Sequence, residues 1–355
     1  MDSSPASRSV DDHIRSVSGM SESLLGELGR SLQRIDEINR TTRIISMNAR
    51  IEAVRIGAAG RGFGVIAEEM DQLSRRVADT TREIGHMAHD TGGALRGTLG
   101  QLEDDVRRTR LTELALANID LIDRNLYERS CDVRWWATDG AVVAAVNNGS
   151  PADIAHAARR LGQILDSYTV YFDLVLAGPD GRIVANGRPD AFASAGRDAG
   201  DSAWFKTAMN TRSGEQFGFQ SVHASPLANG ERVLVYSCTV REGGRVNGRV
   251  LGVLGIVFRW DALAQTVLLR TPLSEGEWAR SCACIVDRDG HVLADSAGRQ
   301  LREDLAFPGM AELLASPRAA TTVELAGRRH CIAHAASPGY GTYATGWHSL
   351  ILQAL

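Results

Sequence analysis

Long apolar runs are missing from this chain of 355 residues. The most apolar stretch, Val250 to Phe258, lies between two arginines and is far shorter than the roughly 20 residues that a membrane-spanning helix needs. The N-terminal sequence MDSSPASRSVDDH has no apolar core of the kind that a signal peptide carries. We therefore expect a cytoplasmic protein with no membrane span.

Cysteine is scarce, and its spacing argues against a disulfide framework. The five cysteines show no C-x-x-C pair, so reduced and mostly buried thiols fit better. Cys282 and Cys284 fall on one face of a predicted strand, but no second ligand pair has suitable spacing for a metal. His86 and His89 lie three positions apart on a predicted helix and also lack a third ligand nearby. We predict no metal site and no cofactor.

Signals of catalysis and of nucleic-acid binding are lacking too. The sequence GRGFG at residues 60–64 follows a helix rather than a strand, and it lacks the lysine and hydroxyl of a phosphate-binding loop. No nucleophile–base pair stands out, so we predict no catalytic residues and no enzyme activity. The net charge is −4 and Lys206 is the sole lysine, so nucleic acid is not an expected partner.

What the sequence does contain is two heptad seams on either side of a glycine-rich segment. Apolar residues alternately three and four positions apart are typical of coiled coils rather than of single globular helices. Gly57, Gly60 and Gly62 lie between the seams and can adopt backbone conformations that other residues resist. The first seam comprises Leu24, Leu28, Ile35, Ile38, Ile45 and Ala49, and the second comprises Phe63, Ile66, Met70, Leu73, Val77, Ile84 and Met87.

This pattern predicts an antiparallel helical hairpin over residues 10–108, after a frayed terminus at 1–9 and with its tip near 55–62. Folding the chain back at the tip pairs Ala49 with Ala67 and gives two arms, each about 70 Å long. A lone hairpin leaves half of its apolar seam in water, whereas two hairpins side by side form a four-helix bundle. We expect a homodimer.

The stretch around the glycines carries a long and specific series of small, charged and aromatic residues. Its members are Asn48, Ala49, Ile51, Glu52, Ala53, Arg55, Gly57, Gly60, Arg61, Gly62, Phe63, Val65, Ala67, Glu68 and Glu69. In this order they resemble the signalling tip of methyl-accepting chemotaxis receptors. The resemblance implies a dimer that controls a chemotaxis histidine kinase together with its coupling protein.

The resemblance also implies which ten tip residues meet partners. Those expected where receptor dimers touch each other are Asn48, Glu52 and Arg55. Those expected near the surface offered to the kinase and the coupling protein are Ile45, Ile51, Ile56 and Val65. Arg61, Phe63 and Glu68 complete the set.

Departures from the receptor pattern keep a second hypothesis open. Arg40 stands where receptors commonly carry a phenylalanine at the contact between dimers, and Ala58 replaces an acidic residue at the turn. No clear Glu/Gln methylation pairs occur on the arms. The alternative is a dimeric ligand-binding adaptor that regulates a partner outside chemotaxis through the coiled coil.

The rest of the chain predicts an α+β region, so the expected fold class is α plus α+β. Region 109–167 is expected to hold connecting helices, one from near Leu111 to Asn147 and one from Ala152 to Asp166. After residue 168 the apolar period changes to that of strands, with turn chemistry at 178–181. The expected strands are 171–176, 183–185, 216–223, 232–240 and 250–259, with a short helix at 204–210.

An internal echo divides this region into two modules. DGRIVAN at residues 180–186 and DGHVLAD at 289–295 share one pattern, 109 positions apart. This predicts two similar modules, at 168–275 and 276–355. A long helix followed by two such modules resembles the double Cache sensor, a relative of the PAS fold. The resemblance implies a small-molecule ligand.

The first module carries the predicted ligand site, a largely apolar pocket with few polar groups. The residues expected around it are Arg197, Asp201, Trp204, Phe205 and Tyr236. The alternative is that Trp204 and Phe205 belong to the core. Ser202 stands where the amino-acid-sensing version of the fold carries an arginine, so an amino-acid ligand is not predicted.

Overall fold

The computed structural model describes residues 10–297 and 304–355, so the predicted frayed terminus lies outside the described part. The chain divides into two compact units, Met1–Arg107 and Arg108–Leu355. We call the first the hairpin and the second the sensor.

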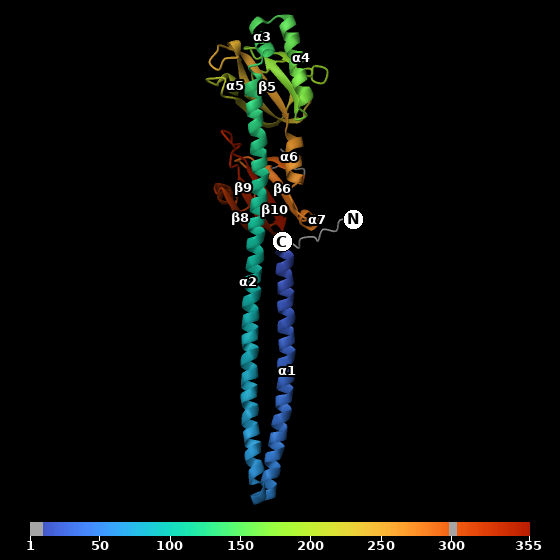
Figure 1. Cartoon of the computed structure of the whole chain (residues 1–355), viewed down its shortest axis with the longest axis vertical. Helices are drawn as coiled ribbons and strands as arrows, with labels where there is room; N and C mark the ends of the chain where they lie inside the picture. The colour runs from blue at the N-terminus through green and yellow to red at the C-terminus, as the bar shows by residue number, and fades with distance from the viewer. Residues whose placement is uncertain (1–9, 298–303) are drawn as a thin grey trace. The chain divides into compact units, whose positions relative to one another are not determined.

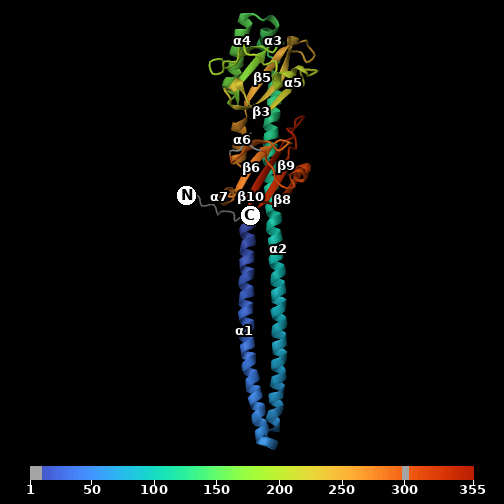
Figure 2. The ribbon, with the colours of Figure 1, turned by 180° about the vertical axis from the view of Figure 1, so that it is seen from behind.

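The hairpin consists of two helices joined by a short 3₁₀ turn. Helix α1 spans Val10–Ile56, η1 spans Gly57–Gly60, and α2 begins at Arg61. Both views show α1 running back alongside α2 (Figures 1 and 2). The predicted helical hairpin is confirmed, with its reversal at the glycine-rich segment.

Small residues let the two arms approach each other closely. The Ser46 hydroxyl donates to the Ala67 carbonyl at 2.5 Å, and the Asn39 amide donates to the Ser74 carbonyl at 2.8 Å. Ala67 therefore lies opposite Ser46, about one helical turn from the predicted partner Ala49.

In the sensor, helix α2 continues past the predicted new start near Leu111 and ends before the predicted end at Asn147. It spans Arg61–Trp136 without a new helix starting near Leu111, and α3 is a separate helix at Gly140–Asn148. The prediction of one helix from Leu111 to Asn147 is therefore wrong at both ends. Asp139 causes the second start, because its carboxylate caps α3 by accepting from the Ala141 amide.

Two five-stranded antiparallel sheets make up most of the sensor. Their strand orders are β2-β1-β5-β4-β3 and β7-β6-β10-β9-β8, which is the same order twice. The first sheet contains β1 (Tyr171–Ala177), β2 (Ile183–Asn186), β3 (Gly218–Ala224), β4 (Arg232–Arg241) and β5 (Val250–Arg259). The second contains β6 (Ser281–Val286), β7 (Val292–Asp295), β8 (Arg318–Leu325), β9 (Arg328–Ala336) and β10 (His348–Ala354).

The repeated sequence pattern forms the same hairpin in each sheet. β1 pairs with β2 through Val175 and Asn186, and β6 pairs with β7 through Cys284 and Asp295. Each pairing is irregular at its turn end. The two predicted α+β modules are thereby confirmed as PAS-like sheets.

Short helices and one long helix cover the sheets. The remaining helical elements are α4 (Pro151–Ser167), α5 (Ala203–Met209), η2 (Pro226–Ala228), η3 (Glu242–Gly244), α6 (Trp260–Leu269), α7 (Glu275–Trp278) and α8 (Met310–Ala315). The largest core cluster joins the sensor part of α2, with α3 and α4, to one face of both sheets. The opposite face of the first sheet packs on α5, and that of the second packs on α8.

Candidate functional site

The hairpin tip presents its apolar side chains to solvent while its backbone is tightly constrained. Gly57 has a φ of +72°, which favours glycine. A Cβ on Gly60 would lie 2.3 Å from the Ala53 carbonyl oxygen, so only glycine fits where the chain reverses. Ala53, Gly60 and Ala67 are buried between the arms. The reversal is thus fixed by small residues, and the larger residues are left on the outside.

All ten predicted tip residues are exposed in the single chain. Phe63 has 67% of its surface exposed, and Ile51 and Val65 are more than half exposed. Ile45, Asn48, Glu52, Arg55, Ile56, Arg61 and Glu68 are exposed as well. Large apolar side chains in solvent next to one another are typical of an interaction surface. Partner binding by these residues stays a prediction.

Exposed ion pairs lie at the tip and leave its apolar residues accessible to solvent. Arg50 pairs with Glu68 at 3.1 Å across the two arms, and Arg55 pairs with Glu52 at 3.7 Å along α1. Both pairs are exposed, so each is expected to contribute well under about 1 kcal/mol to folding. Their charges remain available to a partner.

The predicted ligand residues on α5 are part of a filled core layer. Trp204 is only 2% exposed, and its ring meets that of Phe205 edge-on at 6.0 Å. A Cβ on Gly255 would lie 3.1 Å from the Trp204 ring, so this glycine of β5 lets the ring lie on the sheet. The Ser237 hydroxyl donates to the Trp204 carbonyl at 2.6 Å. These contacts match the alternative that the two aromatic residues serve as core.

The three polar members of the predicted ligand set do not converge on this layer. Arg197 is exposed and donates to the carbonyls of Ala193 and Pro226. Asp201 is exposed and pairs with Lys206 at 2.8 Å, which lowers the pKa of its carboxyl.

Tyr236 lies on the other face of the first sheet from Trp204, because residues alternate along β4. Its hydroxyl contacts that of Tyr343, and burial raises its pKa well above the ordinary tyrosine value. Ligand binding by the five residues remains a prediction, and they do not share one cavity.

Two polar clusters occur in the second module. Asp287, Asp289 and His291 bring metal-type ligand atoms together in the β6–β7 turn. Asp287 already accepts from the backbone amides of Asp289 and His291, which accounts for the cluster as turn chemistry.

The other cluster is a buried histidine pair. His334 Nε2 lies 2.7 Å from His348 Nδ1, and burial lowers the pKa of His334 to about 4. The pKa of His348 is also lowered, by burial and then by Arg288. His348 and Arg288 line a pocket of about 500 Å³. Since both pKa values are lowered, the two imidazoles are neutral at pH 7, which suits their buried position in the second sheet.

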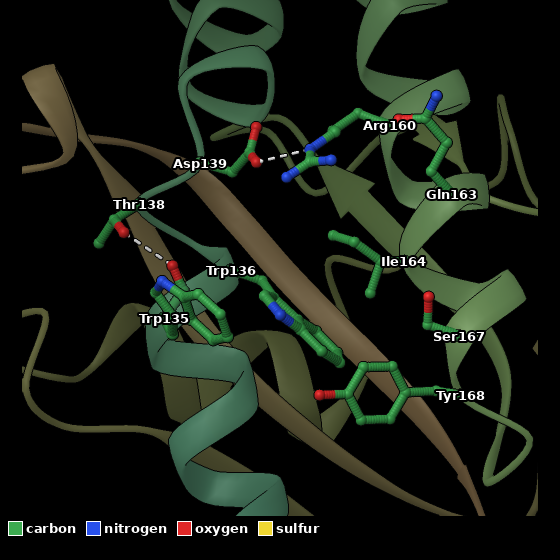
Figure 3. Close-up of a pocket in the computed structure, with 9 residues that line it drawn as sticks. All are labelled: Trp135, Trp136, Thr138, Asp139, Arg160, Gln163, Ile164, Ser167 and Tyr168. Carbon is green, nitrogen blue, oxygen red and sulfur yellow. Dashed lines mark hydrogen bonds and ion pairs between the residues drawn. The ribbon is translucent and has the colours of Figure 1, made fainter.

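A pocket that the sequence did not suggest lies between the end of α2 and α4 (Figure 3). Its volume is about 400 Å³. Ser150 caps α4, and Ala157, Leu161 and Leu165 bury one face of that helix, while Arg160, Gln163, Ile164 and Ser167 line the pocket. The residues that line the pocket are Trp135, Trp136, Thr138, Asp139, Arg160, Gln163, Ile164, Ser167 and Tyr168.

Comparison with known proteins assigns both units to known families. Residues 65–353 match the family model of the Cache domain, and residues 2–121 match that of the methyl-accepting chemotaxis protein signalling domain. Methyl-accepting chemotaxis protein McpN of Pseudomonas aeruginosa is 34% identical over 101 residues, which cover 26% of this chain and 19% of McpN. The chain thus spans about a fifth or less of the length of these curated relatives.

Solved structures share the sensor fold. The ligand-binding domain of the Pseudomonas fluorescens chemoreceptor CtaA, solved with L-serine, has a TM-score of 0.52 at 19% identity and covers 71% of this chain and 98% of its own. The sensory domain of the Campylobacter jejuni chemoreceptor Tlp3 has a TM-score of 0.53 at 13% identity and covers 70% and 94%. Among the described residues, no helix combines the length and apolar character needed to cross a bilayer.

Proposed function

Since this chain belongs to the Cache domain family and carries a methyl-accepting chemotaxis signalling domain, we propose that it is a chemoreceptor-type signal transducer. In this proposal the sensor binds a small molecule, and the hairpin tip controls a histidine kinase through a coupling protein. The observation that supports it most directly is the tip, where ten exposed residues in the receptor order stand on a glycine-fixed reversal.

The hairpin is proposed to work as a homodimer. Large apolar residues along both arms are exposed in the single chain, among them Leu24, Ile38 and Leu73. Burying apolar surface stabilises an assembly by roughly 25 cal/mol per Å². A second hairpin alongside the first would remove these side chains from water and form a four-helix bundle.

The sensor offers a physical route from a bound ligand to α2. Asp123 of α2 is buried and accepts hydrogen bonds from Ser337, Gly339 and Thr345 of the second module. The Tyr236–Tyr343 contact joins that same loop to the first sheet. A ligand with different affinities for two arrangements of the sheets would therefore bias the packing of α2.

The proposed ligand of the sensor is a small molecule, and a related structure indicates which class to screen first. CtaA, the P. fluorescens chemoreceptor, was solved with L-serine, so amino acids form the first set to screen. Ligands that bind the native state raise its apparent melting temperature, so a thermal-shift screen of the full chain is suitable. Small carboxylates form the second set.

The kinase proposal is tested by capture of a purified histidine kinase and coupling protein on immobilised full-length chain. Ile51→Arg and Val65→Arg place a charge on the exposed apolar tip and should abolish capture. Gln72→Arg adds the same charge at an exposed position of α2 outside the ten tip residues and should leave capture intact. Equal capture by all three variants would contradict the assignment of the tip.

A second candidate, a dimeric adaptor for a partner outside chemotaxis, is favoured by one observation. Arg40 has a side chain that is 81% exposed and pairs with Asp36 at 3.6 Å, in place of the aromatic contact of receptor dimers. A fluorescent fusion in the host separates the candidates. Clustering with receptor arrays supports the transducer, and a diffuse signal supports the adaptor.

A further inference from the structure

The pocket between α2 and α4 has two walls of different chemistry (Figure 3). Trp136 and Tyr168 form an aromatic wall, with their rings edge-to-face at 5.2 Å, and Ile164 lies beside them. Trp135 lines the pocket with 70% of its surface exposed, which is unusual for a tryptophan because this residue type is highly buried on average. This wall fits a ring or a short branched apolar group.

The other wall carries an ion pair that leaves donors unused. Arg160 Nε donates to Asp139 Oδ2 at 3.0 Å, and Asp139 Oδ1 accepts from the Ala141 amide at 2.9 Å. Both oxygens of Asp139 are therefore engaged. Within residues 10–297 and 304–355, no hydrogen bond uses the two terminal nitrogens of Arg160 or the hydroxyl of Tyr168.

This balance decides the charge of the ligand. Asp139 already pairs with Arg160, so a cationic ligand at this wall would lie next to the positive charge of the guanidinium. Arg160 is held through Nε, which leaves its two terminal amino groups as a fork for a carboxylate. In Figure 3 the guanidinium of Arg160 reaches from α4 toward Asp139, and both groups are drawn above Trp136 and Ile164.

We propose that this pocket binds a small monocarboxylate with an aromatic or branched apolar body. The carboxylate pairs with the terminal nitrogens of Arg160, and the apolar body lies against Trp136, Ile164 and Tyr168. The volume of about 400 Å³ suits a molecule of this size. The site is distinct from the predicted α5 site, because α4 packs on the opposite face of the first sheet from Trp204.

Binding here does not depend on the proposed function, whereas its use as a signal does. The pocket includes Trp135 and Trp136, which form the last turn of α2. A ligand therefore contacts the helix directly, without acting through the sheets.

The test is isothermal titration calorimetry on the full chain with four matched probes. Phenylacetate carries both the ring and the carboxylate, phenylacetamide lacks the charge, phenethylamine reverses it, and acetate lacks the ring. Phenylacetate should bind, and each of the other three should bind at least about tenfold more weakly, because each loses one of the two walls.

Variants then locate the binding. Arg160→Gln should weaken phenylacetate binding by about tenfold or more, because it removes a charge-assisted pair. Arg159→Gln removes an exposed arginine one position away on α4 and should leave the affinity unchanged. Tyr168→Phe should weaken binding by a few fold, and quenching of tryptophan fluorescence should follow the same order. Circular dichroism melting of each variant shows whether the fold is retained.

Three outcomes would overturn the proposal. These are equal affinity of Arg160→Gln and Arg159→Gln for phenylacetate, tighter binding of phenethylamine than of phenylacetate, and no binding of any probe at millimolar concentration. None of them bears on the capture of kinase by the tip. Conversely, a tip that captures nothing leaves the calorimetry unaffected, so failures of the two proposals are distinguishable.

Discussion

The hairpin and the sensor bury opposite kinds of side chain. In the hairpin the buried residues are small, such as Ser46, Ala53 and Ala67, while Leu24 and Ile38 are exposed. In the sensor the largest side chains, including those of Trp204 and Trp260, are almost entirely buried. The sensor thus contains its own hydrophobic core, whereas the hairpin leaves its large apolar side chains exposed to solvent in the single chain, as is typical of an interaction surface.

The two units also use charge differently. The hairpin has exposed ion pairs such as Arg75–Asp71 at 2.6 Å, which contribute little to folding. The sensor buries single acidic residues in complete hydrogen-bond sets, as at Asp123 and Asp173. Loss of one partner from such a set costs more than loss of a surface pair. Mutations should therefore affect the sensor through folding and the hairpin through association.

The largest expected effect is that of a truncation in the sensor core. Ile122 of α2 is fully buried, so Ile122→Ala should lower the free energy of unfolding by about 3 kcal/mol. All six tryptophans lie in residues 108–355, so urea unfolding followed by tryptophan fluorescence reports on the sensor alone. Leu121→Ala, at a neighbouring position that is about half exposed, should cost less than about 1 kcal/mol. Similar costs for the two would contradict the core described above.

The next effect is the loss, in acid, of the stability that His334 contributes to the sensor. The folded-state pKa of His334 is lowered from its ordinary 6.5 to about 4, so the unfolded chain binds more protons between these values. The stability that neutral His334 contributes should be complete above about pH 6.5 and fall by about 3 kcal/mol as the pH drops toward 4. Burial raises the pKa of Asp173 to about 6, which acts in the opposite direction, so the contribution of His334 is measured as a difference between variants. The measurement is the urea midpoint of tryptophan fluorescence at several pH values.

His334→Leu removes this contribution, so between pH 6.5 and pH 4 its stability should fall less, or rise more, than that of the parent chain, whatever its effect on absolute stability. His89→Leu, in the hairpin, should leave the slope as it is in the parent chain. An identical pH dependence in His334→Leu and in the parent chain would show that His334 does not contribute to it.

The sequence predicted the parts of this molecule that depend on local pattern. The two heptad seams and Gly57 predicted the hairpin, and the echo at 180–186 and 289–295 predicted two sheets that have the same strand order. These features depend on residues close in the chain, whose periods and turn chemistry act locally.

The wrong predictions concern features that depend on contacts between residues far apart in the sequence. The predicted start of a new helix near Leu111 is wrong, because α2 continues through this position. Just before it, Arg108 donates to Thr322 and Arg110 pairs with Glu277, more than 150 positions away. These partners accommodate the charges, and α2 continues. Strand alternation along β4 separates Tyr236 from Val233 and Val235, but the sequence did not show which face of the sheet α5 covers.

The α2–α4 pocket was missed for a related reason. Asp139 and Arg160 belong to different helices, and neither has a distinctive sequence context. The adjacent tryptophans at 135 and 136 were the one available signal, because two neighbouring residues of a helix cannot both face the same core.

A smaller effect is expected at the hairpin reversal. Gly60→Ala should destabilise the hairpin by about 2 kcal/mol, because the new methyl group would meet the Ala53 carbonyl oxygen. The hairpin contains no tryptophan, so helical circular dichroism during melting is the suitable measurement. Gly62→Ala meets nothing within 4 Å and should be neutral or slightly stabilising. A destabilised Gly62→Ala with an unchanged Gly60→Ala would refute the close approach.

The smallest effect on unfolding, and the most direct test of the contrast between the units, concerns Ile38. Its side chain is 67% exposed in the single chain, so Ile38→Ala should change the unfolding free energy of dilute protein by less than about 0.5 kcal/mol. In a homodimer the side chain is removed twice from the shared seam, so dimerisation should weaken by about tenfold or more. Sedimentation equilibrium measures this directly, with Glu37→Ala as the control at a neighbouring exposed position. If both variants associate as the parent chain does, Ile38 does not face a second hairpin, and the exposed seam must serve a different partner.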